Sequence, residues 1–167
     1  MRRMTETNLN SAYSGESMAH MRYLVYGDVA DSEGKSNIAR LFRSIAFAER
    51  VHATNHYQEL GAIGSSVQNL QVAIDGETYE VDEMYPAYRA VAELQGEKGA
   101  QRTADWAWQA ERIHAAMYQK ARQAAESGQD MDLGPMFICE VCGYTVEGQA
   151  PDSCPLCKAP RDRFRQF

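Results

Sequence analysis

Four cysteines near the C-terminus form two C-x-x-C pairs separated by eleven residues: Cys139, Cys142, Cys154 and Cys157. Each C-x-x-C turn lets two thiolates converge on one tetrahedral ion, and two such turns complete a four-thiolate site. Two disulfides are the alternative. The start of the chain contains no apolar export segment, so we expect a reducing cytoplasm, where paired C-x-x-C motifs mainly bind metal. The spacing therefore predicts a metal site.

A second group of candidate ligands lies at helical spacing in the first 134 residues. Glutamates occupy mid-helix positions on stripes that are otherwise apolar: Glu16, Glu49, Glu77, Glu80 and Glu111. Histidine follows two of them at i+3, as His52 and His114, so each Glu-x-x-His pair shares one helix face. The alternative is that these carboxylates face water, as most do.

Burial of these glutamates would require cations. One unpaired buried carboxylate costs several kcal/mol, and a domain is stabilised by only about 5–15 kcal/mol. A glutamate on each of two helices and Glu-x-x-His on the other two is the pattern of carboxylate di-iron bundles. Such oxygen-rich sites suit iron or manganese better than zinc or copper. The pattern predicts a di-metal site inside a bundle.

The elements that must position these ligands are long helices. Apolar periodicity and cap residues predict four of them, at about 8–33, 36–61, 67–91 and 104–121. Pro86 lies inside the third and predicts a kink there. Four long helices with short links predict a helical bundle.

The segment 127–135 has two glycines, a proline and little apolar content, which is typical of a linker. We therefore expect a bundle domain at 1–134 and a tail domain at 135–167 that needs its metal to fold. The net charge is −6 and no lysine or arginine cluster stands out, which argues against nucleic acid as a partner. No apolar stretch approaches the ~20 residues that span a bilayer, so no membrane role is expected.

The residues around the cysteines resemble the two knuckles of rubredoxin, in the runs 137–144 and 154–160. This resemblance favours one iron ion at the four-cysteine site. Zinc is the alternative metal, because spacing alone does not separate the two. Lys158 stands where the second knuckle usually has glycine, so we expect a positive φ there, at a cost on the order of 1 kcal/mol.

From about Leu9 to the C-terminus the chain resembles the rubrerythrin family. The resemblance is carried by five segments: 15–17, 48–53, 76–80, 83–86 and 111–114. It implies a mainly α protein, in which a ferritin-like four-helix bundle with two iron ions precedes a small rubredoxin-like β domain. It also implies a peroxidase that reduces hydrogen peroxide to water in oxidative-stress defence. Electrons would pass through the four-cysteine iron from an external donor, such as a rubredoxin or an NAD(P)H-dependent reductase.

The resemblance also implies roles for the bundle ligands. Glu49 and Glu111 would bridge the two irons. Glu16 would be a terminal ligand of one iron, and Glu77 and His114 would bind the other.

Four residues are implied to be catalytic. Glu80 and His52 would compete for the first iron, which moves from the carboxylate to the imidazole on reduction. Tyr23 and Tyr85 match positions that hydrogen-bond ligand carboxylates, although ordinary core tyrosines are the alternative. The remaining histidines are expected to be structural or surface residues: His20 and His56.

Two other functions remain open on sequence grounds. One is a ferroxidase that handles iron as ferritins do, and the other is a non-catalytic binding module whose tail is a structural zinc knuckle. A covalently attached one-electron donor is of little use to a storage protein, which favours the peroxidase.

The link between the second and third helices is short. Fully extended, residues 61–68 span about 28 Å, whereas the return along the bundle needs about 30 Å or more. This predicts a domain-swapped homodimer, or a larger assembly, in which the first two helices of one chain pair with the last two of another. An unswapped bundle with shorter helices is the alternative.

Overall fold

The structure, a computed structural model, describes residues 1–167 and divides into two compact units, Met1–Gly64 and Ser65–Phe167. The expected fold class is confirmed, because long helices fill the chain up to residue 126 and a small sheet follows. None of the helices combines the length and the apolar composition that crossing a bilayer requires.

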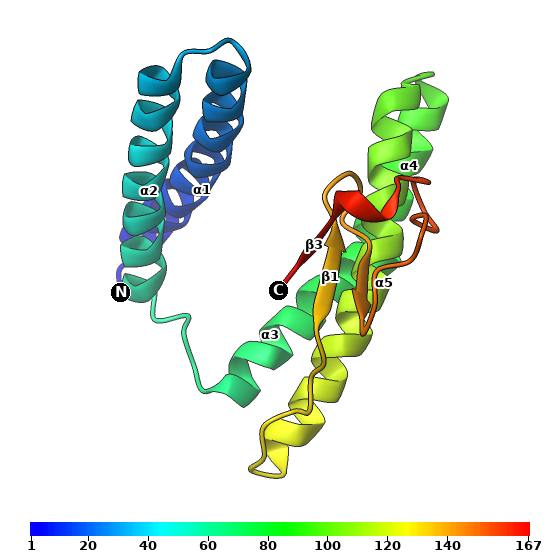
Figure 1. Ribbon diagram of the computed structural model, residues 1–167. Helices are drawn as coiled ribbons and strands as arrows, with labels where there is room; N and C mark the ends of the chain where they lie inside the picture. Colours follow the sequence, from blue (N-terminus) through cyan, green and yellow to red (C-terminus); the bar gives the residue numbers. More distant parts are fainter. The chain divides into compact units, whose positions relative to one another are not determined.

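The first unit is a hairpin of two antiparallel helices, α1 (Arg3–Ser32) and α2 (Ser36–Glu59) (Figure 1). Small residues line the contact between them. Ala39, Ala46 and Ala53 recur every seven residues along α2 and are buried. A Cβ atom on Gly27 would lie 3.2 Å from Cγ of Arg43, a tight contact that the glycine avoids.

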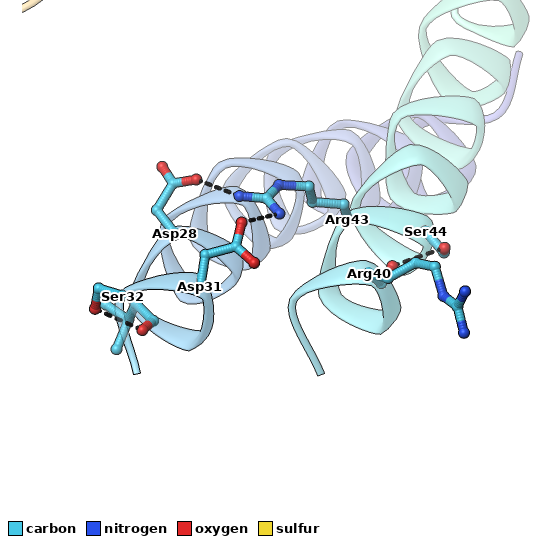
Figure 2. A network of polar contacts seen from close by, with 7 residues as sticks. Asp28, Asp31, Ser32, Arg40, Arg43 and Ser44 are labelled. Carbon is cyan, nitrogen blue, oxygen red and sulfur yellow. Dashed lines mark hydrogen bonds and ion pairs between the residues drawn. The ribbon is translucent and has the colours of Figure 1, made fainter. Parts of the chain in front are cut away.

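Polar contacts fix the alignment of α1 and α2 near the turn of the hairpin. Figure 2 shows the Arg43 guanidinium of α2 reaching two carboxylates of α1. It donates to Asp31 at 2.5 Å and to Asp28 at 2.8 Å. All three side chains are well exposed to solvent, so these ion pairs contribute little to stability. We therefore assign them a role in aligning the two helices.

The second unit begins with the helical segments α3 (Ser66–Tyr79), a π-helical turn η1 (Glu80–Met84), α4 (Tyr85–Leu94) and α5 (Lys98–Glu126). Ile74, Ala92 and Ala110 are its buried apolar helix residues. Together α3, η1 and α4 form the third helix expected from the sequence, and both α3 and α4 pack on α5.

The irregularity in the third helix is the π-helical turn, which lies just before Pro86. The N–H of Tyr85 bonds to the carbonyl of Glu80 five residues earlier, and Pro86 stands in the first turn of α4. Trp108 of α5 donates its indole N–H to the carbonyl of Val81 at 2.8 Å. The turn therefore satisfies its backbone through a neighbouring helix, as interrupted helices commonly do.

The C-terminal part of the second unit is a three-stranded antiparallel sheet of order β2-β1-β3. Its strands are β1 (Met136–Cys139), β2 (Thr145–Glu147) and β3 (Phe164–Gln166), with a 3-10 turn η2 (Arg161–Arg163) before β3. Cys139 ends β1 and pairs with Phe164, while Ile138 pairs with Thr145. No helix or strand is formed between α5 and β1.

Candidate metal sites

The first hairpin brings together two carboxylates and an imidazole, which we call the N-terminal triad: Glu16 of α1 with Glu49 and His52 of α2. Nδ1 of His52 lies 2.9 Å from Oε2 of Glu49 and 3.9 Å from Oε1 of Glu16. Metal–ligand bonds of about 2.1 Å allow two ligands of one ion to lie up to about 4.2 Å apart. Both separations therefore fit a shared cation.

The second unit repeats this arrangement in a C-terminal triad formed by Glu77 of α3 with Glu111 and His114 of α5. Nδ1 of His114 lies 2.5 Å from Oε2 of Glu111 and 3.9 Å from Oε2 of Glu77. In both triads one helix supplies a single glutamate and its neighbour supplies Glu-x-x-His. The structure thus gathers six of the seven expected bundle ligands into two groups of the same composition.

Glu77 shows that the C-terminal triad fits a cation. Its Oε2 atom is buried and has no hydrogen-bond partner. Burial, followed by a hydrogen bond and charge repulsion from Glu111, raises the pKa of Glu77 from 4.5 to about 8. Leaving a buried carboxylate oxygen unpaired is costly, and a bound cation removes that cost.

Glu80 and Tyr85, at the two ends of the π-helical turn, lie beside the C-terminal triad. Burial and then the charge of Glu111 raise the pKa of Glu80, while His114 lowers it. Burial also raises the pKa of Tyr85, and the carboxylates of Glu80, Glu111 and Glu77 raise it further. Both side chains are thus within electrostatic reach of the candidate ligands.

The other residues predicted near the site lie in the hairpin packing. The Tyr23 ring centroid is 6.3 Å from that of Tyr26 and 6.2 Å from that of Phe42. His20 Nδ1 lies 2.7 Å from the carbonyl oxygen of Ala46 and must donate to it, which ties α1 to α2. His20 therefore has a structural contact, and it belongs to neither triad.

The four cysteines converge in the tail as free thiols. Sγ of Cys139 lies 3.6 Å from Sγ of Cys157, and Sγ of Cys142 lies 3.5 Å from Sγ of Cys154. A disulfide would require about 2.05 Å. Tetrahedral coordination with metal–sulfur bonds of about 2.3 Å places sulfurs about 3.8 Å apart. The geometry therefore fits one four-thiolate metal ion and not two disulfides.

The two knuckles have matching backbone geometry. Gly143 at φ 79° and Lys158 at φ 66° each occupy the left-handed region. Their N–H groups donate to the carbonyls of Cys139 at 2.9 Å and Cys154 at 3.0 Å. The positive φ expected for Lys158 is confirmed, and its ammonium group donates to the carbonyl of Pro155 at 3.0 Å.

The thiols of the four-cysteine site differ in acidity. Burial raises the pKa of Cys142 and Cys157. Burial acts in the same direction on Cys154, but backbone N–H groups of Cys157 and Leu156 outweigh it and lower the pKa of that thiol. The thiolate of Cys154 is therefore the most easily formed, and a metal ion would have to displace protons from the neighbouring thiols.

Two contacts near the sites were not predicted from the sequence. Trp108 was not singled out, yet its indole N–H donates to the carbonyl of Val81 in the π-helical turn. Thr145 was not singled out, yet its Oγ1 lies 2.8 Å from Nε2 of His114. Both contacts join residues 27 or more positions apart, and no local pattern signals them.

Comparison with known proteins agrees with this geometry. Residues 7–122 match the rubrerythrin family, and residues 137–165 match the rubredoxin-like domain of rubrerythrin. The chain is 43% identical to Rubrerythrin-2 of Clostridium acetobutylicum over 98% of this chain and 97% of that protein. It is 30% identical to nigerythrin of Nitratidesulfovibrio vulgaris over 98% of this chain and 86% of that protein.

Solved structures give the same relationship. The fully reduced, all-ferrous state of nigerythrin aligns with a TM-score of 0.57 at 30% identity, covering 98% of this chain and 86% of that one. Its mixed-valence state aligns with a TM-score of 0.55 over the same shares.

Proposed function

The chain belongs to the rubrerythrin family, and on that premise we propose that it is a peroxidase that reduces hydrogen peroxide to water. Members of this family are oxidoreductases with iron-binding bundle and rubredoxin-like domains. In the proposal, the bundle holds two irons and the four cysteines hold a third, with zinc as an alternative at the latter. An external donor, such as a rubredoxin or an NAD(P)H-dependent reductase, supplies the electrons.

The single observation that carries this proposal is the repetition of the triad. Each helical pair presents two carboxylates and one imidazole nitrogen to a common point. If the two triads face one another, Glu49 and Glu111 would be shared by the two metals, and Glu16, Glu77 and His114 would be the further ligands. When bound, the pair of irons would supply two electrons to the O–O bond, which avoids a radical product.

The protein side chains have separate tasks in this proposal. Glu80 and His52 would be alternative ligands of one iron, because a carboxylate better neutralises ferric charge and a neutral imidazole suits the ferrous state. Tyr85, beside the carboxylates, and Tyr23 orient ligand oxygens by hydrogen bonding.

The helix bounds support completion of the site by a second copy of the chain. Glu49 lies ten residues before the end of α2, and Glu77 lies eleven residues after the start of α3. If Glu49 and Glu77 of one chain lay at the same level of one bundle, the end of α2 and the start of α3 would be at opposite ends of it. At 1.5 Å per residue, the connector would then have to span about 31 Å along the bundle axis. The seven steps from Glu59 to Ser66 reach at most about 25 Å.

The ends of this connector are well defined. Gly61 at φ 67° follows α2, and a capping box between Ser65 and Gln68 starts α3. The connector is thus shorter than the sequence suggested. A domain-swapped homodimer, in which each metal pair takes one triad from each chain, removes the need for the return.

The proposed activity is tested by reducing the iron-loaded protein without oxygen and then adding one equivalent of hydrogen peroxide. We expect the peroxide to oxidise the bundle irons first and the four-cysteine iron afterwards. A matched sample mixed with oxygen should react more slowly. If peroxide leaves the reduced protein unchanged while oxygen rapidly oxidises it, the ferroxidase function replaces the peroxidase.

A further inference from the structure

Thr145 is a buried polar residue that touches both candidate metal sites. It begins β2 and is 4% exposed. Its hydroxyl oxygen lies 2.8 Å from Nε2 of His114 on α5 and 3.0 Å from the carbonyl oxygen of Gly143. The contact therefore joins the C-terminal triad to the knuckle that carries Cys139 and Cys142.

The single proton of the hydroxyl decides the direction of both hydrogen bonds. A carbonyl oxygen only accepts, so Thr145 donates its proton to Gly143. The same hydroxyl oxygen must then accept the second bond from Nε2–H of His114. A metal ion binds imidazole through a nitrogen lone pair, so when Nε2 keeps its proton for Thr145, Nδ1 is the nitrogen left to bind the metal.

Nδ1 faces the carboxylates of the triad. Nδ1 lies 2.5 Å from Oε2 of Glu111 and 3.9 Å from Oε2 of Glu77. A metal ion bound there requires this tautomer, with the remaining ring N–H bonded to an acceptor. Thr145 supplies that acceptor from another part of the second unit.

The N-terminal triad has no equivalent support. Nδ1 of His52 contacts Glu49 and Glu16, but its ring is 53% exposed and its Nε2 atom has no hydrogen-bond acceptor. His114 is 28% exposed, and its Nε2 atom is held by Thr145. The two imidazoles therefore differ in the support that their own chain gives them, although their helical motifs are the same.

The hydrogen bonds of Thr145 also reach the four-cysteine site. Gly143 directly follows Cys142, and its N–H donates to the carbonyl of Cys139 at 2.9 Å. Two successive hydrogen bonds thus connect the His114 ring to the backbone of this knuckle.

We propose that Thr145 is a positioning residue for His114: its hydroxyl fixes the ring in the tautomer that binds metal through Nδ1 and docks the ring on the Cys139–Cys142 knuckle. The metal it serves is that of the proposed function, but the positioning itself does not depend on peroxide chemistry. Metal affinity at the C-terminal triad should therefore depend on a hydroxyl in the tail.

Zinc-loaded protein tests this without any redox reaction. In the wild type, NMR should detect a His114 Nε2–H proton that is protected from exchange and close to Thr145. Thr145→Ser should keep this signal, whereas Thr145→Val should lose it and bind zinc about 10- to 100-fold more weakly at the bundle. Ser153→Ala is the matched control, since it removes a hydroxyl bonded to the carbonyl of Lys158 in the other knuckle.

Folding of the tail is followed separately through the four-thiolate absorption of cobalt-substituted protein. Thr145→Ala removes the hydroxyl without placing a methyl group against the ring, so it replaces Thr145→Val if the latter disturbs the tail. A protected Nε2–H and unchanged zinc affinity in a folded variant without the hydroxyl would overturn the proposal. Loss of peroxidase activity in the iron-loaded protein would not by itself overturn the proposal. The zinc-loaded protein measures the positioning of His114 without any peroxide reaction.

Discussion

Oε2 of Glu77 lies 3.9 Å from Nδ1 of His114, too far for a hydrogen bond and close enough for both atoms to bind one ion. The corresponding atoms of Glu16 and His52 are also 3.9 Å apart. The same cross-helix separation in both hairpins is what two similar metal positions require. It also leaves Glu77 Oε2 buried without a partner, which makes the metal-free protein sensitive to pH.

We expect the metal-free protein to lose stability as pH rises from about 4.5 to about 8. The folded protein holds the Glu77 proton up to a pKa of about 8, whereas the unfolded chain releases it near 4.5. The folded state therefore binds more protons in this window, and the free energy of unfolding falls as pH rises. Urea denaturation of chelated protein measures this. Glu77→Gln should flatten the dependence, and an equally steep slope in that variant would exclude Glu77 as the cause.

We expect Glu80→Ala to retain the fold and both bundle irons but to slow peroxide turnover by about 10- to 100-fold. Glu80 is the carboxylate beyond the minimal pattern of two glutamates and two Glu-x-x-His pairs, so it serves redox exchange rather than assembly. Asp82→Asn, an exposed change in the same π-helical turn, is the control. Iron content and steady-state rates are measured together. Loss of both irons in the Glu80 variant would contradict this role.

We expect Cys139→Ser to abolish the red colour of the oxidised four-cysteine iron and the steady-state turnover. The chemically reduced bundle should still consume one equivalent of peroxide, because its ligands lie on the helices. Cys157→Ser should behave in the same way. Single-turnover mixing distinguishes the two steps. If the first turnover also disappears in both variants, the tail does more than deliver electrons.

Domain swapping predicts complementation between two inactive variants. Glu49→Ala damages the N-terminal triad and Glu111→Ala the C-terminal one. In a swapped mixed dimer, one centre contains both substitutions and the other contains neither. Random refolding of equal amounts should therefore restore about one quarter of wild-type turnover. Each variant refolded alone is the control. Activity that stays at the level of the separate variants would indicate an unswapped bundle.

The helical bundle and the candidate ligands could be predicted because both depend on local spacing. Glu-x-x-His shares a helix face in any α-helix, and C-x-x-C turns define a knuckle without reference to the rest of the chain. The positive φ of Lys158 could also be predicted from local sequence, since it follows from the position of this residue in the second knuckle.

The contacts that could not be predicted are those between distant elements. Pro86 indicated an irregular third helix, but not the π-helical turn before it or the hydrogen bond that this turn accepts from the indole of Trp108. The hydroxyl of Thr145 reaches His114 only because β2 packs on α5. Both hydrogen bonds reach an element that is distant in the sequence, so spacing within one element does not reveal them.

Whether the two triads form one metal centre is tested most directly by EPR spectroscopy of the iron-loaded protein after one-electron reduction of the bundle. Bridged ferric and ferrous ions couple to a total spin of one half, so we predict this signal in the wild type. Either Glu49→Ala or Glu111→Ala alone should remove it. An uncoupled high-spin ferric signal, with each variant losing only the iron of its own triad, would show that the triads are separate sites.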